Sequence, residues 1–145
     1  MSWPEPQPGL VIRYSYLWHR EAQQGHEEGR KDRPCAVVVA MSNKDGRTRV
    51  YALPITHSAP TQGQQAIEIP PRVKNRLGLD GERSWIVFDE ANVFAWTGPD
   101  LRFVPGKGAE SAAYGFLPPG LFRIVRDRFL DCARKQKSAL VVRTE

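Results

Sequence analysis

The stretch CAVVVAM at residues 35–41 constrains the fold more than any other part of the sequence. An unbroken apolar run of this length, rich in valine, is typical of a short strand that is buried on both faces. Residues 43–46 (NKDG) follow, and Asp-Gly is the strongest short signal for a hairpin. Residues 48–55 (TRVYALPI) then return as the partner strand. The sequence therefore predicts an antiparallel hairpin at the centre of a sheet.

Several shorter strands are predicted around this hairpin, where β-branched and aromatic residues gather between turn signals. They are expected at residues 10–18, 66–69, 84–88 and 93–96. The polar segment 19–33 and the glycine- and proline-rich segment 97–119 predict two long exposed loops. The final ALVVRT either adds a late strand or frays.

Two helical segments are predicted. A helical turn should run from Pro70-Pro71 to Leu77 and be closed by Gly78. A longer helix is expected over residues 121–134, where apolar side chains recur with a helical period at Leu121, Ile124, Val125, Phe129 and Cys132. Together the elements predict a mainly β (α+β) single domain over residues 1–145, a small barrel or curled antiparallel sheet with a C-terminal helix.

The charge of the chain favours a polyanionic partner. Lys and Arg exceed Asp and Glu, which gives a net charge of +5 and a pI near 9.5. No apolar run is long enough to cross a bilayer and the N-terminal residues lack a leader pattern, so we expect a cytoplasmic protein with no membrane partner. Cys35 and Cys132 lack the spacing of a metal or redox pair and are expected to be reduced packing residues.

Candidate chemistry lies in the expected loops. Glycines flank His26 and Glu27, which would let the backbone approach a ligand closely. Arg33 falls at the mouth of the buried strand and Thr56 at the end of its hairpin partner, so these side chains are expected to meet at one rim of the sheet. Asp89 follows a later strand. The scattered histidines lack ligand spacing, so no metal and no cofactor is expected.

In this order, the groups resemble the MazF/PemK-type toxins, sequence-selective endoribonucleases of bacterial toxin–antitoxin pairs. The family opens with a glycine and a strand, continues with a Gly-(Ser or His)-Glu-Gln loop and an Arg-Pro before valines, and ends its third strand with Pro-(Ile or Val)-Thr. A later strand leads to Asp-Gln, and Gly-x-Leu precedes a helix. Over roughly residues 9–131 the matching positions are Gly9, Gly25-His26-Glu27, Arg33-Pro34, Pro54-Ile55-Thr56, Asp89-Glu90 and Gly115-Phe116-Leu117. The resemblance implies an SH3-like barrel of the CcdB/PemK type.

The chain also departs from the family pattern. The loop before Arg33 is longer than usual, and His26 lies one residue farther from Arg33 than the commoner spacing. Val87 stands where PemK-like members carry an arginine, so that cation is either missing or supplied from elsewhere, with Arg83 as the candidate. Glu90 replaces the family's glutamine.

Metal-independent cleavage of RNA by its own 2′-hydroxyl needs a base, a cation for the phosphorane and an acid for the leaving oxygen. Arg33 suits the second task because its planar fork can grip two phosphate oxygens and stays charged. Thr56 can donate a hydrogen bond to the same phosphate, and His26 or Glu27 could take the 2′ proton.

Further RNA contacts are assigned to the residues Trp18, Arg30, Lys31, Arg83 and Asp89. The resemblance implies single-stranded RNA, and messenger RNA in particular, as the substrate. It also implies a homodimer that an acidic antitoxin protein holds inactive.

Other readings stay open. The same barrel could bind RNA or a protein without cutting, since Val87 replaces the family's arginine, or it could be a gyrase-poisoning toxin of the related kind. Residue by residue, Arg33 could be a plain surface charge, Thr56 a turn cap, and His26 with Glu27 a solvated loop. Asp89 could be an ordinary turn residue, and Trp18 could belong to the core instead of stacking on a base.

Overall fold

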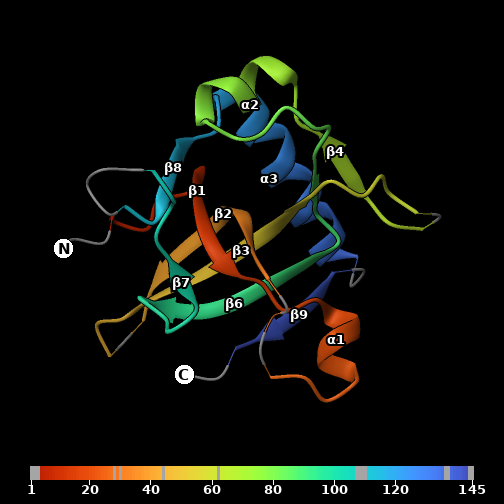
Figure 1. Ribbon diagram of the computed structural model, residues 1–145. Helices are drawn as coiled ribbons and strands as arrows, with labels where there is room; N and C mark the ends of the chain where they lie inside the picture. Colours follow the sequence, from red (N-terminus) through yellow and green to blue (C-terminus); the bar gives the residue numbers. More distant parts are fainter. Residues whose placement is uncertain are drawn as a thin grey trace.

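The computed structural model describes residues 4–27, 29, 31–43, 45–61, 63–106, 111–135 and 138–143, and within them strands predominate. In chain order the elements are β1 (Leu10–Ser15), α1 (His19–Gln23), β2 (Asp32–Ser42), β3 (Thr48–Thr56), β4 (Ala66–Glu68), α2 (Pro71–Leu77), β5 (Trp85–Val87), β6 (Glu90–Trp96), β7 (Leu101–Arg102), β8 (Ala113–Phe116), α3 (Pro119–Arg134) and β9 (Ala139–Val142) (Figure 1). The mainly β, α+β class with a C-terminal helix is confirmed.

The predicted central hairpin is confirmed in β2 and β3. These strands pair antiparallel from Cys35 opposite Pro54 to Ser42 opposite Thr48, with a bulge between Val37 and Val39. Each has further neighbours, because β1 pairs with the other edge of β2 while β5 and β6 pair with β3. Residues 35–38 of the apolar run are buried, as a strand covered on both faces requires, whereas Val39 and Ala40 are partly buried and Met41 is exposed.

The sheet is open, which corrects the prediction of a small barrel or curled sheet. Its main path runs β4-β5-β3-β2-β1-β7, with β8 beside β1 and β6 between β3 and β9. Closure would need the end strands β4 and β7 to pair, and among the described strands they do not. The sheet is neither closed nor strongly curled. The local sequence signals that predict strands cannot show whether the sheet closes, because closure depends on which edge strands pair with each other.

Of the two alternatives for the C-terminal tail, the structure has the strand. β9 pairs parallel with β6, the one parallel pairing among the described strands. The buried Arg143 follows it, with Nη2 lying 2.9 Å from Asp100 Oδ2 and Nη1 donating to the Ser15 carbonyl at 2.6 Å. This contact anchors the end of β9 against the β1 side of the molecule.

The segments 19–33 and 97–119, both expected to be loops, contain regular structure. His19–Gln23 forms α1, because Glu21 caps its start: the carboxylate accepts the Trp18 amide N–H at 3.1 Å. In 97–119, β7 and β8 form because β1 supplies their hydrogen bonds. Neither the Glu21 cap nor the pairing with β1 gives the local sequence a periodic pattern of apolar residues.

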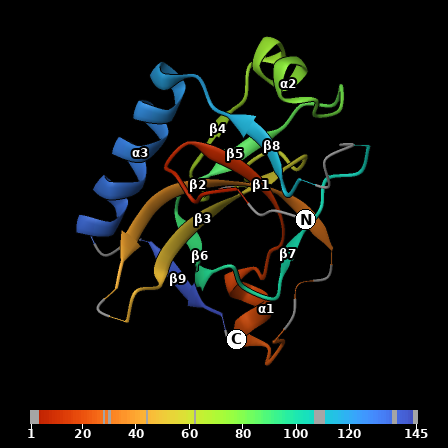
Figure 2. The same cartoon turned by 90° about the vertical axis from the view of Figure 1, so that its left-hand side faces the viewer.

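The predicted helices are confirmed, and both help to bury the core. Val125, Phe129 and Cys132 of α3 pack with buried residues of β2, β3 and α2, while Ile124 lies on the exposed side of the helix. α2 ends at Gly78, whose φ of 72° is the left-handed conformation expected of a helix-closing glycine. Figure 2 shows α3 lying along one side of the sheet, at a distance from α1.

Cys35 and Cys132 are both buried thiols outside any disulfide among the described residues, as predicted. No helix in the described residues is long and apolar enough to cross a membrane.

Candidate functional site

A cleft of about 350 Å³ opens at the rim of the sheet where β2 begins and β3 ends. The start of β2 contributes Lys31 and Arg33 to its wall, and the end of β3 contributes Ile55 and His57. The connection between α2 and β5 closes another side with Asp80. Because the central hairpin determines where β2 starts and β3 ends, the fold brings these segments together.

Arg33 is half-buried in this wall and is held without a carboxylate partner. Its Nη1 donates to the Ile55 carbonyl at 3.3 Å, and its guanidinium carbon lies 5.1 Å from the centre of the Trp18 ring. No ion pair to Arg33 occurs in the described part of the chain. Burial lowers the pKa of Arg33 from its usual value, yet a guanidinium stays protonated at physiological pH. Arg33 is therefore a positioned positive charge, which the nearby Glu21 carboxylate partly offsets.

Two more cations surround Trp18 beside Arg33. Arg20 places its guanidinium 5.0 Å from the Trp18 ring, and Lys31 lines the same hollow of about 260 Å³. Like Arg33, neither forms an ion pair within the described ranges. Glu21 also lines this hollow, so one carboxylate moderates the cluster. We call Arg20, Lys31 and Arg33 the cationic rim.

Trp18 supports the cationic rim and does not offer its face to a nucleotide. Only 6% of its surface is exposed, and two guanidinium groups contact its ring. The side chain belongs to the core, which was the alternative to a base-stacking role. Its contribution to a site is to position Arg20 and Arg33.

Thr56 lies one residue beyond Ile55, whose carbonyl binds Arg33. The paired register of β2 and β3 ends at Cys35 opposite Pro54, and Thr56 and Arg33 line different hollows. Thr56 is buried and lines a hollow of about 220 Å³ together with Trp18 and Arg20. Its hydroxyl oxygen accepts the Ser58 N–H at 3.1 Å, so Thr56 caps a turn while its own proton stays available for donation.

The proposed bases are not brought into the cleft. His26 and Glu27 lie exposed in the turn after α1, and neither lines the cleft or the two hollows beside it. Arg30, assigned to RNA binding, lies outside the described residues.

Arg83 and Asp89 also lie away from the cleft. Arg83 forms a two-pronged ion pair with Glu68, at 2.7 and 2.9 Å, and stacks over Trp85 at 5.0 Å. It lines a different hollow, so it does not replace the arginine that the family has in place of Val87. Asp89 accepts the Gln65 N–H at 3.2 Å, and its partial burial raises its pKa. Its observed role is to hold the start of β4.

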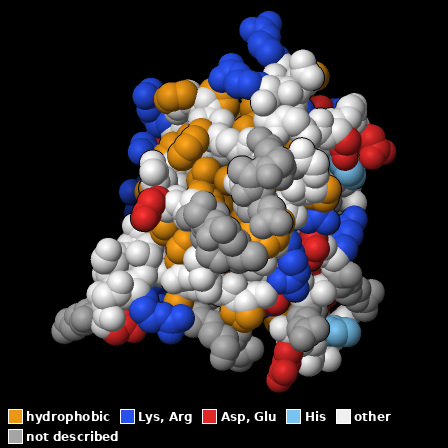
Figure 3. All heavy atoms as spheres, turned by 60° about the vertical axis from the view of Figure 1, so that its left-hand side comes forward, with side chains coloured by type: hydrophobic (Ala, Val, Ile, Leu, Met, Phe, Trp, Pro, Cys, Tyr) orange, Lys and Arg blue, Asp and Glu red, His pale blue; other side chains and the backbone are white. Residues whose placement is uncertain are grey.

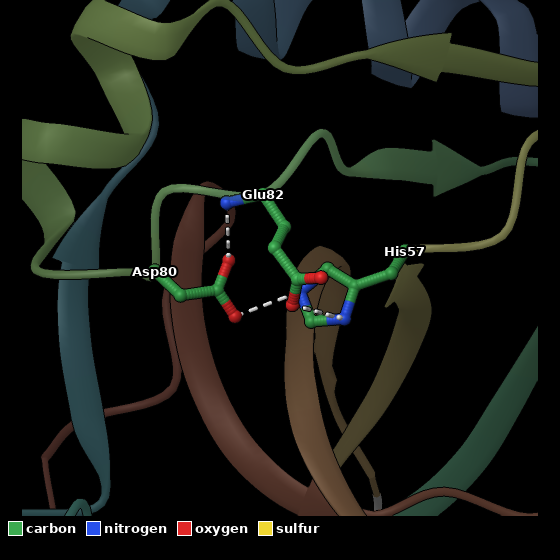
Figure 4. A group of neighbouring side chains, drawn as sticks. All are labelled: His57, Asp80 and Glu82. Atoms are coloured by element: carbon green, nitrogen blue, oxygen red, sulfur yellow. Dashed lines mark hydrogen bonds and ion pairs between the residues drawn. The ribbon is translucent and has the colours of Figure 1, made fainter.

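The structure also brings together His57, Asp80 and Glu82, a group that was not predicted from the sequence (Figure 4). His57 Nε2 lies 2.7 Å from Asp80 Oδ2, and Nδ1 lies 3.6 Å from Glu82 Oε2. One ligand-type atom from each residue lies within 4.8 Å of the others, a spacing that a divalent cation could accept. The acidic members follow α2 and His57 follows β3, so spacing along the chain gave no sign of the group. Its one sequence signal is that His57 directly follows Thr56.

The net positive charge does not form a continuous basic surface on the face drawn in Figure 3. Hydrophobic side chains gather at its centre, while Lys and Arg side chains form separate groups around the margin with acidic side chains among them. On this face, the net charge of +5 is therefore divided among separate groups and forms no single basic surface.

Comparison with protein-family models, with curated proteins and with solved structures gave no match.

Proposed function

We propose that this chain is an endoribonuclease that holds single-stranded RNA at the cationic rim and cuts it by attack of the substrate's own 2′-hydroxyl. The observation that carries the proposal is the state of Arg33. A half-buried guanidinium, anchored by Ile55 and Trp18 and without a carboxylate partner in the described residues, is suited to an external anion. Arg20 and Lys31 extend the same positive charge along the rim.

Arg33 would stabilise the phosphorane in this reaction. Its charge does not need to be reorganised as negative charge develops on the phosphoryl oxygens, and such prearranged electrostatics is usually the largest contribution to catalysis. The Thr56 hydroxyl would donate a weaker hydrogen bond to the same group. No step of this scheme requires a cofactor.

The cellular setting extends this proposal through the resemblance to MazF/PemK-type toxins. An acidic antitoxin protein would cover the cationic rim and compete with RNA for the same charges in the cytoplasm. A homodimer is proposed on the same basis. The exposed side chains of Leu140 and Val142 on β9 support an apolar contact, since 48% and 67% of their surfaces are accessible.

The test is a single-turnover cleavage assay with Arg33→Ala and Arg33→Lys at saturating RNA. Arg33→Ala should lower the rate by about 10²-fold or more, comparable to the loss of an oxyanion-hole donor. Arg33→Lys should recover only part of the loss, because an ammonium cannot reproduce the fork. Arg83→Ala is the matched control, because Glu68 already neutralises that exposed arginine. It should cut at the wild-type rate.

The mode of cleavage is tested with a substrate that carries a single 2′-deoxy sugar at the cut position. It should bind and resist cleavage, because its nucleophile is missing. Cleavage of this substrate would contradict 2′-hydroxyl attack and indicate an activated water.

A non-catalytic RNA-binding module is the second candidate, and the position of Val87 favours it. Val87 is fully buried in β5, so the position where the family carries an arginine points into the core here. Equal RNA binding by wild type and Arg33→Ala, with no cleavage by either, would establish this candidate over the nuclease.

A further inference from the structure

His57 lines the same cleft as Lys31 and Arg33, two members of the cationic rim. It follows Thr56 directly at the end of β3. About half of its side chain is accessible, so a ligand in the cleft could reach it. His26 was predicted to take the 2′ proton, but its turn is not part of that cleft.

Asp80 holds one nitrogen of His57 in place. Its Oδ2 lies 2.7 Å from His57 Nε2, while its Oδ1 pairs with Lys74 Nζ at 2.7 Å and accepts the Glu82 N–H at 3.1 Å. Lys74 is itself buried and also donates to the Glu82 carbonyl, so it fixes the position of Asp80. The hydrogen bond from Lys74 lowers the pKa of Asp80, which keeps it ionised as an acceptor. A carboxylate that orients a histidine is the recurring support of a general base.

The second nitrogen of His57 is the one that can exchange a proton. Glu82 Oε2 lies 3.6 Å from Nδ1, beyond ordinary hydrogen-bond length. The Glu82 side chain is 74% exposed, so it can move away without disturbing the core. Nδ1 is therefore less firmly held than Nε2.

We propose that His57, oriented by Asp80, is the proton acceptor for RNA cleavage in this cleft, an inference that rests on the proposed ribonuclease function. The Nδ1 lone pair takes the proton of the 2′-hydroxyl, and the 2′-oxygen forms a bond to phosphorus. The bond from phosphorus to the 5′-oxygen breaks, and that oxygen takes a proton from water. The products are a 2′,3′-cyclic phosphate and a 5′-hydroxyl end, and the imidazolium returns its proton to solvent.

Among the described residues, charged groups lie around His57 on several segments. They are Asp80 and Glu82 of the α2–β5 connection, Lys74 of α2 behind Asp80, Lys31 just before β2, and Asp32 and Arg33 of β2 across the cleft. Tyr114 of β8 lines the same cleft. In this arrangement the negative charge of Glu82 repels a phosphate of the RNA, while the positive charges of Arg33 and Lys31 attract it. Removing the charge of Glu82 should leave proton transfer intact and should not weaken RNA binding.

The experiment measures single-turnover cleavage and RNA affinity for His57→Ala, with His26→Ala as the matched control. His57→Ala should lower the rate by about 10²- to 10⁴-fold, the usual contribution of a general base, and change the affinity by less than about threefold. Added imidazole should restore part of the rate, which a purely structural role would not allow. His26→Ala should cut like wild type.

Glu82→Gln and a chelator separate proton transfer from metal chemistry. If His57 is the base, Glu82→Gln should cut at a rate within about threefold of wild type, and EDTA should have no effect. A rate abolished by EDTA or by Glu82→Gln would overturn the assignment in favour of a metal-dependent reaction. A His57→Ala rate equal to wild type, beside a slow Arg33→Ala, would overturn the role of His57 and leave the ribonuclease standing. A wild-type chain that does not cut RNA would overturn both.

Discussion

RNA affinity should depend on salt with a slope that the cationic rim determines. Each cation that neutralises a phosphate of a single strand releases counterions and contributes about −0.7 to the slope of log affinity against log salt. Arg20, Lys31 and Arg33 have no carboxylate partner in the described residues, so together they predict a slope of about −2.1. Between about 50 and 200 mM salt, the affinity should therefore fall by about 18-fold.

Single substitutions test this arithmetic residue by residue. Lys31→Ala, at an exposed position, should reduce the slope to about −1.4 and the loss over the same salt range to about sevenfold. Arg83→Ala should leave the slope unchanged, because its charge is already paired with Glu68. Fluorescence anisotropy with a labelled RNA at several salt concentrations measures each slope. A flat wild-type response, or an equal effect of Arg83→Ala and Lys31→Ala, would refute the assignment of RNA binding to this rim.

Two other properties can be measured without RNA. Because the hydrogen bond from Lys74 lowers the pKa of Asp80, their pair stabilises the folded chain above the usual carboxylate pKa of about 3.9, and this contribution disappears as the pH falls through the lowered value. The difference in free energy of unfolding between wild type and Asp80→Asn, from urea denaturation, should shrink on acidification, and a difference independent of pH would contradict this cause. If the exposed apolar side chains of β9 mediate a homodimer, light scattering should give about twice the chain mass of 16.4 kDa, against which a clean monomer at micromolar concentration would count.

The hairpin could be predicted because its signals are local and agree with one another. The apolar run of β2, the Asp-Gly turn and the return strand all favour a hairpin at the same place. The register of the pair then places Arg33 beside the end of β3, so one edge of the site followed from the sequence. The open sheet did not follow, since pairing of edge strands with β1 and β6 joins segments far apart in the chain.

The short helix α1 was missed because a polar side chain stabilises it. Glu21 is buried and caps the Trp18 amide, whereas an amphipathic pattern of apolar residues was the expected sign of a helix. The consequence reaches the site. α1 turns Trp18 inward and places Arg20 against its ring beside Arg33. Trp18, which the sequence suggests as a platform for base stacking, therefore supports the two arginines.

The same distinction explains why the sequence points to His26 and not to His57 as the base. His26 was attractive for its neighbours in sequence, two glycines and a glutamate, but the turn after α1 lies outside the cleft. His57 had no such neighbours, because its carboxylate comes from the segment after α2. A general base is defined by what orients it and by the proton it can reach, and both are spatial properties. Of the two histidines, His57 is the one that contacts a carboxylate, Asp80, and that lines the cleft wall holding Arg33.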